Sequence, residues 1–235
     1  MKALSNFVKI TFFTALISTL LFSMGDHQNN QADFRSVQKA DAVNVQKGKN
    51  KDFCPVCGMT LHHFHKTNFA ATSSGNESQY CSLICLVEDE IVNNKKMTNI
   101  RVVDNLTMKM IDAKKASYVV GSNKPATMSA ISIYGFGTLD GAKKFAAQNG
   151  GDVKDFEAIY SMVKSTQAKD MAATKERQAN ASKNGAMMYE KMCKKTDAKF
   201  KSIADAKAFL IESKICGDMD DKKLQVIAIY LVTKK

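Results

Sequence analysis

The chain has 235 residues and a formal net charge of +11, which arises from 34 Lys and Arg against 23 Asp and Glu. Its hydrophobic content of 45% and its mixed charges exclude a largely disordered chain and fit one or two globular domains. No arginine-rich or aromatic-interleaved segment resembles a nucleic-acid-binding surface, so we expect no nucleic acid partner. The basic surplus fits solubility and a weak attraction to an anionic membrane or an acidic partner.

Residues 1–25 have the pattern of a secretory signal peptide. Lys2 and Lys9 precede an apolar run at 10–22, and Ser23-Met24-Gly25 then supplies small residues for cleavage. The run of roughly 13 residues is short for a spanning helix, which needs about 20, although extension to 7–24 leaves an uncleaved membrane anchor open. No cysteine follows the run, which excludes lipid attachment there. We predict a periplasmic or exported protein, in an oxidising space where free thiols tend to pair.

Residues 26–52 are rich in Gln, Asn and Lys, which predicts a flexible tether. From residue 53 to about 158, strand-like and helical patterns alternate. Helices are expected at 81–94, with Ser82 as a candidate N-cap, and at 140–149, ended by Gly150-Gly151. Strands are expected at 68–72, 100–104, 108–112, 117–121 and 130–136. This order predicts an α+β domain with two similar halves.

Beyond residue 156 the pattern becomes helical. Residues 161–184 contain no Gly or Pro and predict a long exposed helix, which we expect Gly185 to end. Shorter helices are expected at 186–193, 203–213 and 220–231. Cys193 and Cys216 flank a helical hairpin in this tail, and we expect a disulfide between them that stabilises the tail by roughly 3 kcal/mol.

The other four cysteines form two close pairs, Cys54-Pro-Val-Cys57 and Cys81-Ser-Leu-Ile-Cys85, about 25 residues apart, a spacing at which thiolates bind metal. The first pair falls on a tight turn, and the second is expected on one face of a helix. Such a set of four sulfurs is typical of a structural zinc site, of two disulfides or of a soft-metal site, and the spacing alone leaves these open.

Met59 favours Cu(I), because thioether sulfur is a poor zinc ligand and a good Cu(I) ligand. The alternative is that Met59 fills a gap in the core, as Met commonly does, and the chain has 13 of them. Met128, beside a turn at 124–127, is a second candidate thioether ligand. The candidate metal ligands are therefore Cys54, Cys57, Met59, Cys81, Cys85 and Met128.

Two other chemistries stay open at these residues. Cys54 and Cys57 could act as a thiol-disulfide oxidoreductase, but this needs a low-pKa cysteine at a helix start, and the residues that follow are poor helix openers. The four cysteines could instead build a structural zinc module that serves as a partner-binding protein. For His63 and His65 we favour solvated surface side chains over a role as copper ligands.

At these residues the chain resembles the NosL family, the periplasmic copper-delivery proteins of nitrous oxide reductase maturation. The resemblance covers residues 53–159 and rests first on Cys54-Pro-Val-Cys57-Gly-Met59. Further matching pieces, in chain order, are the Val-Asp and Ile-Asp-Ala segments within 100–113, Tyr118-Val-Val-Gly-Ser122, Thr127-Met128, Phe136, Ala142, Phe145 and Gly150-Gly151.

The resemblance implies a periplasmic metallochaperone, not an enzyme, with a fold of two small ββαβ units. It implies that Cys54, Cys57 and Met59 bind Cu(I), which passes to the nitrous oxide reductase maturation machinery at the membrane. Met128 stands in Thr-Met-Ser, where the family usually has Pro-Met-Gly. The chain lacks the lipid-bearing cysteine common in the family, and it stays open whether one cysteine pair or both hold the ion.

The tail resembles a c-type cytochrome that has lost its haem motif. Residues 185–193 are similar to the first helix of such a protein, and residues 220–231 are similar to its last. Haem attachment needs Cys-x-x-Cys-His, which Cys193 does not begin, so we expect no covalent haem. The expected organisation is a signal peptide at 1–25, a tether at 26–52, a metal-binding domain at 53–159, a linker helix at 160–184 and a helical tail at 185–235.

Overall fold

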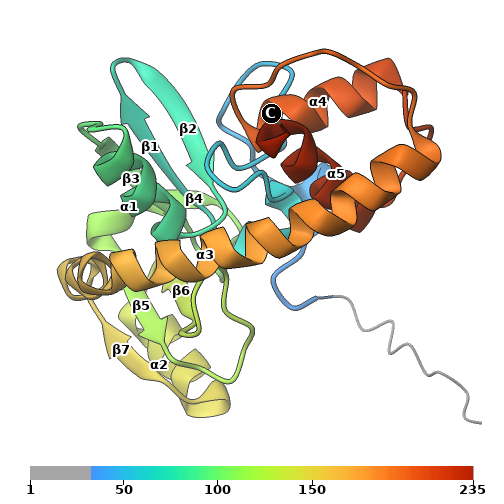
Figure 1. Ribbon diagram of the computed structural model, residues 1–235. Helices are drawn as coiled ribbons and strands as arrows, with labels where there is room; N and C mark the ends of the chain where they lie inside the picture. Colours follow the sequence, from blue (N-terminus) through green and yellow to red (C-terminus); the bar gives the residue numbers. More distant parts are fainter. Residues whose placement is uncertain (1–32, 235) are drawn as a thin grey trace, which may run out of the picture. The chain divides into compact units, whose positions relative to one another are not determined.

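The computed structural model describes residues 33–234, so the predicted signal peptide at 1–25 lies outside the described residues. The described residues belong to one compact unit. It contains two small sheets, a long helix and two further helices at the C-terminal end (Figure 1). Within residues 33–234 no helix is both long and apolar enough to cross a membrane.

The first sheet has four antiparallel strands in the order β2-β1-β3-β4. These strands are β1 (Phe69–Ser73), β2 (Asn76–Tyr80), β3 (Thr98–Val103) and β4 (Met110–Asp112). The helix α1 (Leu83–Val92) follows β2 and contacts both the sheet and the long helix α3 (Phe156–Met192). Because α1 is covered from both, its residues 83–87 are all buried.

The second sheet has three antiparallel strands in the order β6-β5-β7. Its elements are β5 (Ser117–Val120), β6 (Ile133–Phe136), α2 (Leu139–Asn149) and β7 (Asp152–Lys154). The Thr138 hydroxyl accepts a hydrogen bond from the Gly141 N–H at 3.1 Å and begins α2, and Gly150 ends it with a φ of +72°. The order strand, strand, helix, strand occurs in both halves, which confirms the predicted α+β class with two ββαβ-like units.

The predicted strands are all present with shifted ends, but three kinds of element escaped prediction. β2 is a polar edge strand, Asn-Glu-Ser-Gln-Tyr, and lacks the alternation that marks a half-buried strand. β7 has only three residues. Short 3-10 helices occur at Lys39–Asp41, Leu61–Thr67 and Ala113–Lys115.

The long helix α3 continues through Gly185, so the prediction that Gly185 ends it was wrong. α3 is one helix of 37 residues that begins at the Asp155 N-cap, whose carboxylate accepts from the Ala158 N–H at 2.8 Å. A Cβ at position 185 would lie 2.0 Å from the carbonyl oxygen of Val226 in α5 (Asp221–Thr233). Glycine is therefore needed for close helix packing at this point, which offsets its low helix propensity of about 1 kcal/mol.

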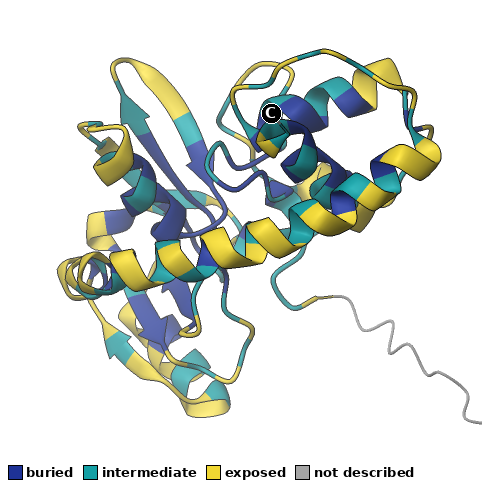
Figure 2. Ribbon diagram, in the orientation of Figure 1, coloured by how far each residue is buried: buried dark blue, intermediate teal, exposed yellow. Residues whose placement is uncertain are grey.

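The helical tail has a core of its own. α4 (Ile203–Ser213) begins and ends as expected, and α5 packs against both α4 and α3. The predicted disulfide between Cys193 and Cys216 is present. α3 contributes Ile159 and Val163 to the core of the sheets and Tyr189 to the core of the tail. In Figure 2 much of α3 is exposed, while a larger share of the residues in the strands, α1, α4 and α5 is buried.

Residues 33–52, expected as part of a flexible tether, lie against the domain in a defined path. The backbone N–H of Val37 donates to the carbonyl of His62 at 3.0 Å, and that of Lys66 donates to the carbonyl of Arg35 at 3.1 Å. The Gln79 side chain accepts from the Val45 N–H at 3.0 Å. Polar composition misled the prediction, because this segment is held mainly by hydrogen bonds, to which Phe34 adds a contact with the Tyr134 and Phe145 rings.

Candidate metal centre

The first cysteine pair lies on a tight turn that follows Phe53. The Cys54 N–H donates to the carbonyl of Met59 at 2.9 Å, and the Gly58 N–H donates to the carbonyl of Cys54 at 2.9 Å. Gly58 has a φ of +72°, which side chains rarely allow, and a Cβ there would lie 2.2 Å from the side chain of Ile203 in α4. Glycine at this position thus permits both the turn and the approach of the tail.

The second pair lies at the junction of β2 and α1. Cys81 directly follows β2, and Cys85 lies in the first turn of α1. The expectation that both share one helix face was therefore wrong in part, because Cys81 precedes the Ser82 N-cap. Cys85 sits at the positive end of the helix dipole, which by itself favours a thiolate, but its cysteine neighbours outweigh this effect and raise its pKa.

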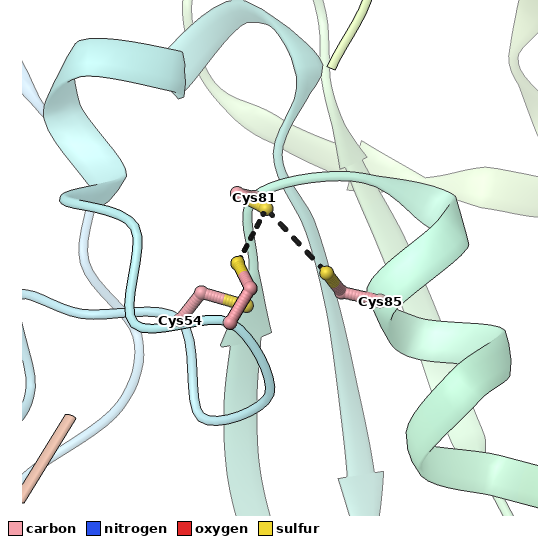
Figure 3. Close-up of side chains that lie close together, drawn as sticks. Cys54, Cys81 and Cys85 are labelled. Carbon is pink, nitrogen blue, oxygen red and sulfur yellow. Dashed lines mark hydrogen bonds between the residues drawn. The ribbon is translucent and has the colours of Figure 1, made fainter. Parts of the chain in front are cut away.

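The fold brings the two pairs together into one cluster. The four sulfurs all lie within 4.8 Å of one another, with 3.4 Å between those of Cys57 and Cys81 and 3.6 Å between those of Cys81 and Cys85. Figure 3 shows the Cys54, Cys81 and Cys85 side chains converging from the turn and from the start of α1. Four sulfurs at about 2.3 Å from a tetrahedral metal ion would be about 3.8 Å apart, so the cluster needs little adjustment to hold one.

All four cysteines of the cluster are free thiols and buried. Burial raises the pKa of Cys54, but hydrogen bonds from Cys57, Cys81 and Cys85 outweigh it, and the pKa falls well below its usual value. Burial and the hydrogen bond to Cys54 raise the pKa of Cys81 well above its usual value, and the hydrogen bonds to its cysteine neighbours do the same for Cys85. The cluster therefore favours a thiolate at Cys54 and thiols at Cys81 and Cys85, and a bound cation would displace further protons.

The two candidate methionines both pack against the core that contains these cysteines. Met59 follows the first turn directly and also lines a surface groove. Met128 has a φ of +68° and lies next to Thr127, whose hydroxyl is 3.0 Å from that of Thr67. The Thr67 hydroxyl is in turn 2.8 Å from the Cys81 carbonyl oxygen, which connects the Met128 loop to the cluster. Thioether ligation by Met59 and Met128 stays a prediction.

Two side chains of the helical tail form hydrogen bonds to the Cys54 turn, and this contact was not predicted from the sequence. The Lys207 ammonium, on α4, donates to the Gly58 carbonyl at 2.9 Å, the Thr60 hydroxyl at 3.1 Å and the Gln225 side chain at 3.0 Å. Gln225, on α5, donates to the Cys57 carbonyl at 2.9 Å. Lys207 is 1% exposed, and burial lowers its pKa to about 8. The turn that carries two of the four sulfurs is therefore held from both tail helices.

A signal for Lys207 was present in the sequence. Helical spacing places Lys207 on the same face as the apolar residues Ile203, Ala206 and Leu210. A lysine on the apolar face of a helix is seldom buried without partners, so the pattern indicated a specific acceptor. The Gly58 and Thr60 acceptors lie 149 and 147 positions earlier, and no local pattern could identify them.

The three nearby histidines are not among the four clustered ligands. His65 is fully buried with its Nε2 3.2 Å from the Met108 carbonyl oxygen, so the expectation of a solvated surface side chain was wrong there. Burial lowers the pKa of His65. His63 is partly exposed, as expected, and its Nδ1 lies 3.0 Å from a carboxylate oxygen of Asp221 at the start of α5.

A cysteine-rich α+β domain with two ββαβ-like units and one buried sulfur cluster is suited to a soft metal ion. The family model of NosL matches residues 44–164, just over half of the 235 residues, and the chain belongs to the NosL family. The match begins within the segment expected as a tether and ends in α3, so the tail lies outside the matched residues.

One solved structure that is similar to this chain is the crystal structure of the copper chaperone NosL from Shewanella denitrificans. It has 20% sequence identity and a TM-score of 0.40, and the similarity covers 49% of this chain and 95% of that one. A comparison with curated proteins found no significant match.

Proposed function

We propose that this protein is a periplasmic metallochaperone that binds Cu(I) and delivers it for the assembly of nitrous oxide reductase. Its place in the NosL family supports this role. The observation that carries the proposal is the buried cluster of four cysteine sulfurs, within 4.8 Å of one another, with Met59 packed against the same core. Soft sulfur ligands of both kinds select Cu(I) over hard cations.

In this proposal the cargo moves by ligand exchange and no substrate is turned over. The Cys54 and Cys57 thiolates hold Cu(I), with Met59 as a labile third ligand. Low coordination leaves a position for an incoming donor, and the metal never becomes a free ion. Cys81 and Cys85, whose pKa values are raised, stay protonated until their sulfurs also become ligands of the ion. The recipient is the reductase maturation machinery at the membrane, and the net charge of +11 favours docking on an acidic partner or an anionic lipid surface.

A structural zinc module is the second candidate, and one observation favours it. The sulfur separations of 3.4 and 3.6 Å are close to those of a tetrahedral four-thiolate site. A thiol-disulfide oxidoreductase is disfavoured, because Cys54 is 0% and Cys57 3% exposed, and neither sulfur can reach a disulfide in a protein substrate.

The test is an anaerobic Cu(I) titration of the chain from residue 26 onward against a competing chelator, with zinc in parallel. We expect one tightly bound Cu(I) per chain, with affinity lowered at least about 100-fold in Cys54→Ser and Cys57→Ser, or about 2.7 kcal/mol. Tight zinc binding that needs all four cysteines, with only unspecific copper uptake, would instead establish the zinc module.

Met59→Ile separates the two candidates most directly. Loss of the thioether should weaken Cu(I) binding about tenfold and leave zinc binding unchanged. Met187→Ile is the matched control, because Met187 is 58% exposed on α3 and belongs to neither core. Equal Cu(I) affinity in Met59→Ile and Met187→Ile would remove Met59 from the ligand set.

A further inference from the structure

The sulfur cluster is closed to solvent, so an incoming ion needs a route to it. Cys54, Cys81 and Cys85 are 0% exposed and Cys57 is 3% exposed. A groove of about 660 Å³ opens beside the first turn and is lined by Met59, Thr60 and His63 on one side and by α5 on the other. Met59 also packs against the core that contains the cysteines. Met59 is thus a soft side chain that both lines the groove and contacts the core around the cluster.

His63, in the same groove, is oriented as a metal ligand. Its Nδ1 lies 3.0 Å from Oδ2 of Asp221, so the ring N–H donates to the carboxylate and the lone pair is on Nε2. Metal-binding histidines are commonly held in this way by a carboxylate. Asp221 is itself fixed, since its Oδ1 accepts a hydrogen bond from the Thr60 hydroxyl at 3.3 Å.

Both sides of the groove contribute to this arrangement. Thr60 and His63 belong to the segment that follows the cysteine turn, whereas Asp221 begins α5 of the tail. His63 and Asp221 are 42% and 41% exposed, so the pair is accessible from solvent. The tail lies outside the residues that match the family, and it supplies the carboxylate that orients His63.

We propose that His63, oriented by Asp221, and Met59 form a capture site that takes Cu(I) from an incoming donor complex and passes it to the buried cysteines. The inference rests on the proposed function. Cu(I) first binds His63 Nε2 and the Met59 thioether as its bonds to the donor ligand break. It then forms a bond to a cysteine sulfur as the bond to Nε2 breaks, and a thiol that becomes a ligand releases its proton to solvent. The copper stays Cu(I) throughout, so no oxidant or reductant is needed.

The test compares the rate of Cu(I) uptake with the equilibrium affinity. The chain from residue 26 onward is mixed anaerobically with a coloured Cu(I)–chelator complex, and the loss of colour is followed by stopped flow. We expect His63→Ala to slow uptake at least about tenfold while the dissociation constant changes less than about twofold, because the final sulfur ligands are intact. Asp221→Ala should slow uptake in the same direction.

His62→Ala is the matched control. The His62 ring centroid lies 4.2 Å from that of His63, but His62 lines a different cavity beside Lys39 and Asp52. Unchanged uptake in His63→Ala, or equal slowing in His62→Ala, would overturn the capture site while leaving the chaperone function in place. A wild-type chain that binds no Cu(I) at equilibrium would overturn both.

A second measurement is independent of rates. Ag(I), which resembles Cu(I) in its ligand preference, is titrated into the 15N-labelled wild-type chain and followed through the histidine ring nitrogens. We expect the second equivalent to shift Nε2 of His63 and to leave both ring nitrogens of His62 in place. A His63 signal that stays unmoved at two equivalents would contradict the proposal.

Discussion

Lys207 offers a sharp test of how the tail holds the metal-binding turn. Its ammonium is 1% exposed, has three hydrogen-bond acceptors and lies 4.5 Å from the centroid of the Phe53 ring. Burial lowers its pKa from the ordinary 10.5 to about 8. We consider Lys207→Met, which keeps an unbranched side chain one atom shorter and removes the charge.

The sign of the pH effect follows from the lowered pKa. Between pH 8 and 10.5 the folded chain has lost the Lys207 proton while the unfolded chain still binds it, so the stability of the wild type rises with pH in this window. Below the folded pKa the buried charge lowers the free energy of unfolding by its full amount. At about 1.36 kcal/mol per pKa unit, the wild type should gain about 2 kcal/mol relative to Lys207→Met between about pH 7 and about pH 9.5.

The assay is urea unfolding of both chains at the two pH values, with the difference between the chains as the readout. The other ionisable groups are common to both chains, so their contributions cancel to first order in the difference. Lys222→Met is the control, because Lys222 is on the exposed side of α5. A difference between wild type and Lys207→Met that is independent of pH would refute the reasoning, since it would mean that Lys207 is not a buried charge in the folded chain.

Three other perturbations have defined outcomes. Gly185→Ala should lower the free energy of unfolding by at least about 2 kcal/mol, although helix propensity alone predicts a gain of about 1 kcal/mol. Thermal melting distinguishes the two, because the melting temperature falls in the first case and rises in the second. Gly58→Ala, which combines a positive φ with a 2.2 Å clash against α4, should lower metal affinity at least about tenfold in the chelator titration. Replacing both Cys193 and Cys216 by Ser should lower stability by about 3 kcal/mol in urea unfolding yet leave Cu(I) affinity unchanged, and a loss of binding would implicate the tail disulfide in the site.

Local patterns were sufficient for most of the fold. Alternating residues predicted the strands β3 and β4, and apolar spacing predicted α4 at its observed ends. The errors lie where tertiary contacts overrule local preference. Gly185 is a helix breaker by propensity, but its missing side chain admits α5. Residues 33–52 are polar enough for a tether but are fixed by hydrogen bonds to side chains and backbone far along the chain.

At the candidate site, too, local spacing predicted one part and tertiary contacts determined the rest. Cys54, Cys57, Cys81 and Cys85 could be grouped from spacing, since thiol pairs at such intervals come together in metal sites. Spacing did not place Cys81 before its helix rather than in it. The contacts from Lys207 and Gln225 could not be predicted, because they join segments more than 140 residues apart and depend on how α4 and α5 dock.

Because α3 is continuous, its length sets both the distance and the rotation between the core of the sheets and the core of the tail. Val163 is buried in the core of the sheets, and Ala181 packs on the core of the tail, with unbroken helix between them. One residue inserted between these points would turn everything beyond by about 100° and move it by about 1.5 Å. Gly185 would then no longer face α5, and Lys207 and Asp221 would lose their places at the metal-binding turn. A connecting loop tolerates such changes in length. In α3, by contrast, the number of residues sets the rotation of the tail about the helix axis and thus the position of the tail residues that contact the metal-binding turn.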